Sequence, residues 1–70
     1  MKYIWEAEDI KPGVRYTQKG ITEVHMIGYM ASRIGHQRMV SISLEDGMVQ
    51  GPKEAAEWAE MLTVHNYIPA

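Results

Sequence analysis

The segment VSISLEDGMVQGP, residues 40–52, decides the fold that the sequence predicts. Its first half alternates strictly between apolar and polar residues, which is the period of a β-strand with one buried face and one face in solvent. The alternation assigns the apolar side chains to the core and the hydroxyl groups to solvent. The buried set is Val40, Ile42 and Leu44, and the solvent-facing set is Ser41, Ser43 and Glu45.

Asp46-Gly47, inside this segment, predicts a tight hairpin. A two-residue turn of this kind has a positive φ at both positions, which Asp tolerates and Gly adopts readily. The predicted register pairs Glu45 with Met48, Leu44 with Val49, and Ser43 with Gln50. Leu44 and Val49 would then share the buried face of the sheet.

A C-terminal α-helix is predicted from Pro52 to Val64. Proline suits the first helical position, because the N–H that it lacks would have no partner there. Apolar residues recur at three- and four-residue spacing along the segment, which is the pattern of a helix that packs one side on a core. Trp58 and Leu62 are therefore expected in the core, together with Ile42 and Leu44.

Extended segments are also predicted upstream of residue 40. Residues 2–5 and 14–18 have the composition of short strands, and residues 21–31 are rich in β-forming side chains. Lys11-Pro12-Gly13 predicts a turn, because Pro fixes a φ near −65° and Gly accepts a positive φ. Residues 32–37 are expected to connect two strands.

The expected fold class is α+β, a small antiparallel sheet of three to four strands with one C-terminal α-helix packed on one face. The 70 residues form one domain, in which residues 1–20 are expected to be peripheral. The chain has no cysteine, so disulfides and thiolate–metal sites are excluded. No apolar run approaches the roughly 18 residues of a membrane span, and no signal-peptide pattern opens the sequence. We expect a cytoplasmic protein that does not interact with membranes.

The sequence contains no clear motif for catalysis or for binding a cofactor. His25, His36 and His65 do not follow a compact metal-ligand spacing, and the serines do not lie in a nucleophile motif. The glutamates of the predicted helix recur every third residue, which is typical of a solvated face. We expect no catalytic residues, no metal site and no cofactor.

The apolar content of the strands exceeds what one helix can cover. Residues 21–31 carry apolar side chains on both faces, and we expect the face with Ile21, Ile27 and Tyr29 to stay open unless the N-terminal segment folds over it. An exposed apolar patch of this kind marks a protein interface. The predicted partner is an unidentified protein, or a second copy of the chain in a symmetric dimer. The predicted contact residues are Met26, Tyr29, Met30, Arg33, His36 and Arg38.

Nucleic-acid binding is the alternative function. Basic residues gather in the loops Arg15–Lys19 and Arg33–Arg38, and Tyr16 adds an aromatic ring that could stack on a base. Against this reading, the formal net charge is −2, whereas proteins that neutralise many phosphates usually carry a basic surplus.

The hairpin and helix signals at residues 44–59 resemble those of small proteins encoded by tailed phages and prophages. Such proteins are mostly non-enzymatic and commonly bind a host enzyme, such as RNA polymerase or a defence nuclease. The resemblance implies an accessory protein that binds and modulates a host protein.

The same stretch is similar to the core of GYF domains, which bind proline-rich peptides. Gly51-Pro52 matches the Gly-Pro pair that precedes their helix, and Trp58 and Met61 are present in reversed order. Lys53 stands where these domains have an aromatic residue, and their upstream tryptophan strand is missing. The resemblance implies a second alternative, a GYF-like binder of proline-rich peptides.

Overall fold

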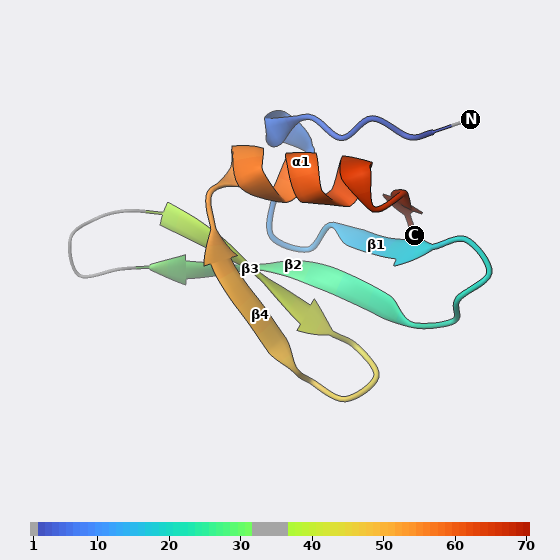
Figure 1. Cartoon of the computed structure of the whole chain (residues 1–70). Helices are drawn as coiled ribbons and strands as arrows, with labels where there is room; N and C mark the ends of the chain where they lie inside the picture. The colour runs from blue at the N-terminus through green and yellow to red at the C-terminus, as the bar shows by residue number, and fades with distance from the viewer. Residues whose placement is uncertain (1, 32–36) are drawn as a thin grey trace.

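One antiparallel sheet with a helix on one side forms the body of the protein. The structure, a computed structural model, describes residues 2–31 and 37–70. Within these ranges the sheet has the strand order β4-β3-β2-β1-β5, and α1 and η1 lie on the same side of it (Figure 1). The elements are η1 (Ala7–Asp9), β1 (Arg15–Gln18), β2 (Val24–Ala31), β3 (Gln37–Ser43), β4 (Val49–Lys53), α1 (Ala55–Val64) and β5 (Tyr67–Pro69).

The predicted α+β class is confirmed, but the described sheet has five strands instead of three to four. The additional strand is β5, which pairs with β1 through Ile68 and Thr17; the sequence predicted a tail there. The predicted strand at residues 2–5 is absent. Trp5 instead donates its backbone N–H to Thr63 Oγ1 (2.9 Å) and its indole N–H to the Tyr67 carbonyl (2.9 Å). These bonds fix the N-terminal segment to the end of α1 and to β5.

The β3–β4 hairpin turns where Asp46-Gly47 predicted, but with a longer loop. The N–H of Ser43 donates to the Met48 carbonyl (2.8 Å), which bounds a four-residue loop, and within it the N–H of Gly47 donates to the Ser43 carbonyl (2.8 Å). Among these loop residues only Gly47 has a positive φ, +76°, so the two-residue turn is not formed. The Asp46 carboxylate accepts the N–H of Met48 (3.0 Å), a bond that lowers the pKa of Asp46.

The longer loop changes the predicted register by two residues. Val49 pairs with Ile42 instead of Leu44, and Gln50 pairs with Ser41 instead of Ser43. Because side chains alternate with a period of two, this shift keeps Val49 on the same side of the sheet as Ile42 and Val40. The predicted partner across the hairpin was wrong, and so was the predicted burial of this face, since Val49 is 60% exposed.

The helix begins three residues later than predicted. Lys53 still belongs to β4, where it pairs with Met39, and its ammonium lies 4.5 Å from the centre of a Trp58 ring. The placement of Pro52 at the first helical position was wrong, because this residue lies within β4. The predicted end of the helix at Val64 is confirmed.

The core lies between the sheet and α1, and the N-terminal segment contributes to it. Trp58 and Leu62 are fully buried, as predicted, whereas Leu44 is 46% exposed and was wrongly assigned to the core. Residues 1–20 are not merely peripheral, since three of them are buried. The core cluster consists of Trp5, Ile10, Tyr16, Ile27, Trp58, Ala59 and Leu62.

The two serines predicted to face solvent are buried on the side of the sheet that faces α1, here called the inner face. Ser41 forms a hydrogen bond with the Tyr16 hydroxyl, and Ser43 donates to a Glu23 carboxylate oxygen at 3.1 Å. The small side chain of Ser41 leaves room for the Tyr16 ring, whose hydroxyl it contacts. Because both hydroxyls have partners, burying them carries little penalty.

Ionisation of the Tyr16 hydroxyl lowers the free energy of unfolding at alkaline pH. Burial raises the pKa of Tyr16 above 10.0, although the hydrogen bond with Ser41 acts in the opposite direction. Below pH 10.0 both the folded and the unfolded state keep the proton. Above it the unfolded state loses its proton first, so the free energy of unfolding must fall, by at most about 1.4 kcal/mol per pH unit.

Tyr16→Phe is therefore expected to weaken this decrease. The measurement is urea unfolding one unit below and one unit above the ordinary tyrosine value of 10.0. Tyr29→Phe serves as the control, because Tyr29 is 48% exposed, and it should keep the wild-type pH dependence. An equal decrease in wild type and Tyr16→Phe would contradict the assignment to Tyr16.

Candidate functional site

The face of the sheet opposite α1, here called the outer face, is largely apolar. Tyr16 and Ile27 point toward the helix, so their neighbours along each strand point away from it. The strand pairings bring these side chains together, with Met26 beside Ile42 and Ile42 beside Val49. The apolar members of the outer face are Val24, Met26, Met30, Val40, Ile42, Val49 and, on β5, Ile68.

Gly28 lies at the centre of the outer face and allows its neighbours to pack closely. A Cβ atom at Gly28 would lie 2.9 Å from Ile42 Cδ1 and 3.2 Å from Val40 Cγ2. These two side chains therefore occupy the space that a side chain at Gly28 would need. Val40 is only 7% exposed, whereas Met30 and Val49, nearer the ends of the patch, are 41% and 60% exposed.

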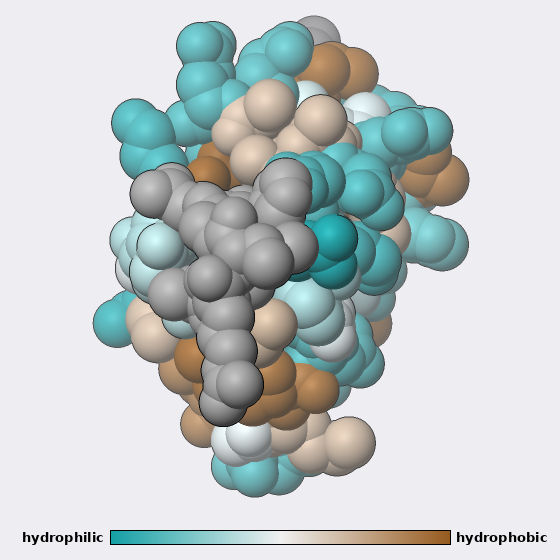
Figure 2. Space-filling view, turned by 90° about the vertical axis from the view of Figure 1, so that its left-hand side faces the viewer, coloured by the Kyte–Doolittle hydropathy of each residue, from teal (hydrophilic) through white to brown (hydrophobic). Residues whose placement is uncertain are grey.

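No helix or strand of the described ranges packs on the outer face. Both α1 and η1 lie on the inner side, and they contact each other there (Figure 1). Trp5 and Ile10 join the core on that same side, in one cluster with Ile27. Residues 2–10 therefore do pack on the face that carries Ile27, as the alternative allowed, and the open face is the opposite one. Figure 2 shows hydrophobic surface in the lower half of the molecule and further hydrophobic patches in the upper half.

The structure places half of the predicted contact residues on the outer face. Met26, Met30 and Arg38 lie there, with Met30 directly opposite Arg38. Tyr29 lies on the other face, opposite Met39, and the open face was wrongly identified as the one that carries Ile27. Arg33 and His36 lie outside the described residues.

Sequence reasoning missed most of the apolar members of the outer face. Val40, Ile42 and Val49 were assigned to the buried face of the hairpin, because their alternation with serine is the usual mark of a core-facing strand. The alternation separated the two faces correctly. It did not contain the information about which face the helix covers.

Basic side chains border the apolar residues. Arg15 pairs with Met26 from the β1 side, and Arg38 pairs with Met30 from the β3 side. Arg38 Nε lies 3.9 Å from a Glu54 oxygen, and both side chains are about half exposed, so this pair contributes little stability. An apolar centre with a charged border is the usual anatomy of a protein interface.

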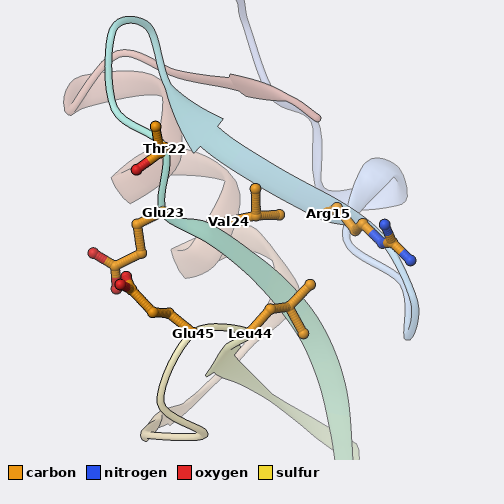
Figure 3. Close-up of a pocket in the computed structure, with 6 residues that line it drawn as sticks. All are labelled: Arg15, Thr22, Glu23, Val24, Leu44 and Glu45. Atoms are coloured by element: carbon orange, nitrogen blue, oxygen red, sulfur yellow. The ribbon is translucent and has the colours of Figure 1, made fainter.

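A groove of about 450 Å³ opens at one end of the outer face, where β2 begins and β3 ends. Figure 3 shows the Glu23 and Glu45 carboxylates at one side of it and the Arg15 guanidinium at the other, with Val24 and Leu44 between them. Thr22 completes the lining. Leu44 is held beside β2 because its N–H donates to the Val24 carbonyl at 2.9 Å.

Two of the three histidines considered as metal ligands make contacts within the fold. His25 stacks on the Tyr16 ring at 5.2 Å, and His65 ends α1, where its carbonyl accepts a bond from Gln18 Nε2 (3.0 Å). His36 lies outside the described residues. In residues 2–31 and 37–70, no group of three His, Asp or Glu side chains is arranged to hold a metal ion.

The aromatic residues invoked for the two alternative functions, nucleic-acid binding and binding of proline-rich peptides, are buried in the core. Tyr16 is 2% exposed, so its ring cannot stack on a nucleotide base. Trp58 is fully buried and cannot form part of a cradle for a proline-rich peptide. None of the helices that the structure describes has the length and apolar character needed to cross a membrane.

Comparison of the chain with protein-family models, with curated proteins and with solved structures gives no match.

Proposed function

We propose that the protein is a small, non-catalytic interaction domain that binds a partner protein with its outer face. The observation that carries this proposal is the apolar surface formed by Met26, Met30, Ile42 and Val49, over which no described helix or strand packs. Removing apolar surface from water contributes about 25 cal/mol per Å², so a complementary partner gains affinity there. The resemblance to phage and prophage accessory proteins would make that partner a host protein.

The arrangement of polar groups supports a non-catalytic role. Ser43 Oγ donates to the Glu23 carboxylate at 3.1 Å, and His25 Nε2 lies 3.7 Å from the same carboxylate. An activated serine would instead donate its proton to a histidine nitrogen at about 2.6–3.2 Å. Here the histidine ring stacks on buried Tyr16, so the cluster stabilises the end of the sheet.

The proposal predicts that Met30→Ser combined with Val49→Ser abolishes partner binding and leaves the fold intact. Both side chains are substantially exposed, so each substitution should change the free energy of unfolding by about 0.5 kcal/mol. A buried Met or Val side chain contributes about 1.5–3 kcal/mol at an interface. The two substitutions together should therefore lower the affinity for the partner at least about a hundredfold.

The measurement is affinity capture with tagged protein, followed by titration calorimetry with each purified candidate partner. The matched control is Ile4→Ser with Val64→Ser, two equally exposed apolar residues that lie off the sheet, and it should bind as wild type does. A partner that binds the outer-face variant and wild type equally overturns the proposal. If sedimentation shows a wild-type dimer that the outer-face variant loses, the occupant is a second copy, and the proposal of a different partner fails.

A further inference from the structure

The groove at the end of the outer face combines an apolar middle with charged groups of opposite sign at its two sides. Its volume of about 450 Å³ is ample for one long side chain of a partner. Val24 and Leu44 form the middle, the Glu23 and Glu45 carboxylates stand at one side, and Arg15 stands at the other (Figure 3). This distribution selects an occupant that is apolar along its length and charged at its tip.

We propose that the groove receives a lysine or arginine side chain of the partner protein, an inference that rests on the proposed function. The alkyl part of such a side chain packs on apolar surface while its charged head stays hydrated. Here the alkyl part lies against Val24 and Leu44. The cationic head lies between the carboxylates of Glu23 and Glu45.

The carboxylate side of the groove is partly organised before binding. Ser43, which is buried, donates to Glu23 Oε1 at 3.1 Å, and this bond fixes the orientation of the Glu23 carboxylate. The Glu23 side chain remains 40% exposed, so it stays accessible to a ligand. In the described part of the chain, no ion pair engages the Glu45 carboxylate. A preorganised acceptor lowers the entropic cost of binding a cation.

Arg15 fixes the direction in which the occupant enters. A second positive charge near its guanidinium would be repelled, so the cationic head must point toward the two carboxylates. A neutral apolar side chain would fill the middle of the groove but leave the Glu45 carboxylate without a counter-charge. An anionic side chain would be repelled by the two carboxylates and would find only the single positive charge of Arg15 at the opposite side. The groove therefore distinguishes a basic side chain from the other two classes.

The first experiment uses Nα-acetyl-arginine amide and Nα-acetyl-norleucine amide as probes in an NMR titration of the full chain. We expect the arginine probe to shift the amide signals of Val24, Leu44 and Glu45, with shifts that shrink as salt is added. The norleucine probe, which has no charge, should cause much smaller shifts there. Equal shifts from the two probes, or shifts only elsewhere on the protein, would overturn the proposal.

The matched variants test the two carboxylates. Glu23→Gln with Glu45→Gln removes the charges, while the amide oxygen introduced by Glu23→Gln can still accept the bond from Ser43. The control, Glu57→Gln with Glu60→Gln, makes the same change of charge on the exposed side of α1. The arginine shifts should disappear in the groove variant and persist in the control. Shifts that survive in the groove variant contradict the proposal.

The same variants separate failure of this inference from failure of the proposed function. The groove variant should bind the partner protein roughly fivefold more weakly than the control variant does. If it binds equally well while Met30→Ser with Val49→Ser does not bind, the groove inference fails and the proposed function stands. If the outer-face variant binds as wild type does, the proposed function fails, whatever the probes show.

Discussion

Trp58→Ala is expected to lower the free energy of unfolding by about 3–5 kcal/mol, which is a large share of the stability of a chain of this length. The side chain is fully buried at the centre of the core cluster, and truncating a buried tryptophan costs about 3–5 kcal/mol. A chain of this length has a total stability of only about 4–10 kcal/mol. The indole N–H also donates to the Met39 carbonyl at 2.7 Å, and the substitution leaves that carbonyl without this donor. One residue thus accounts for much of the free energy that keeps the helix on the sheet.

The measurement for Trp58→Ala is urea unfolding followed by far-UV circular dichroism. Trp58→Phe is an informative companion, because it keeps an aromatic ring and loses only part of the volume and the N–H donor. We expect it to fold with intermediate stability. The control is Val64→Ala, a change at an exposed position of the same helix, which should unfold close to wild type. Cooperative unfolding of Trp58→Ala within about 1 kcal/mol of wild type would show that the core does not depend on this ring.

The helix was predictable because its signal is long and regular. Ten helical residues provide several repeats of the three- and four-residue spacing, so Trp58 and Leu62 could be assigned to the core from pattern alone. β5 has only three residues, one of them Pro69, and such a segment contains no period to recognise. Its pairing with β1 depends on where α1 returns the chain, which is a tertiary effect.

The sequence predicted that one apolar face of the sheet stays open, but it predicted the wrong face. The sequence showed that residues 21–31 carry apolar side chains on both faces and that one helix covers only one face. It did not show that the buried Tyr16 hydroxyl bonds to Ser41, which is buried on the inner face. Once Ser41 is buried, the alternation places Val40 and Ile42 outside. The face that hydrophobicity alone assigned to the core is therefore the one that α1 does not cover.

Gly51→Ala is the second substitution expected to have a large effect. Gly51 has a φ of +101°, a conformation that L side chains rarely adopt, and strain of this type costs about 1–3 kcal/mol. An added Cβ would also lie 3.0 Å from Trp58 Cζ2 and 3.3 Å from the Met39 carbonyl oxygen. Neither group can move easily, because the Trp58 ring is fully buried and the carbonyl belongs to β3. We expect a loss of at least about 2 kcal/mol in the free energy of unfolding.

Gly13→Ala separates the two contributions to this loss. Gly13 has a similar φ of +92°, but no atom lies within 4 Å of the position that its Cβ would take. The control therefore carries the backbone strain without the contact, and urea unfolding should show a clearly smaller loss than for Gly51→Ala. The difference measures how tightly β4 is packed beneath Trp58. If the two variants lose equal stability, the close approach of Gly51 to the ring does not restrict this position, and the chain between β4 and α1 can shift to make room for a side chain.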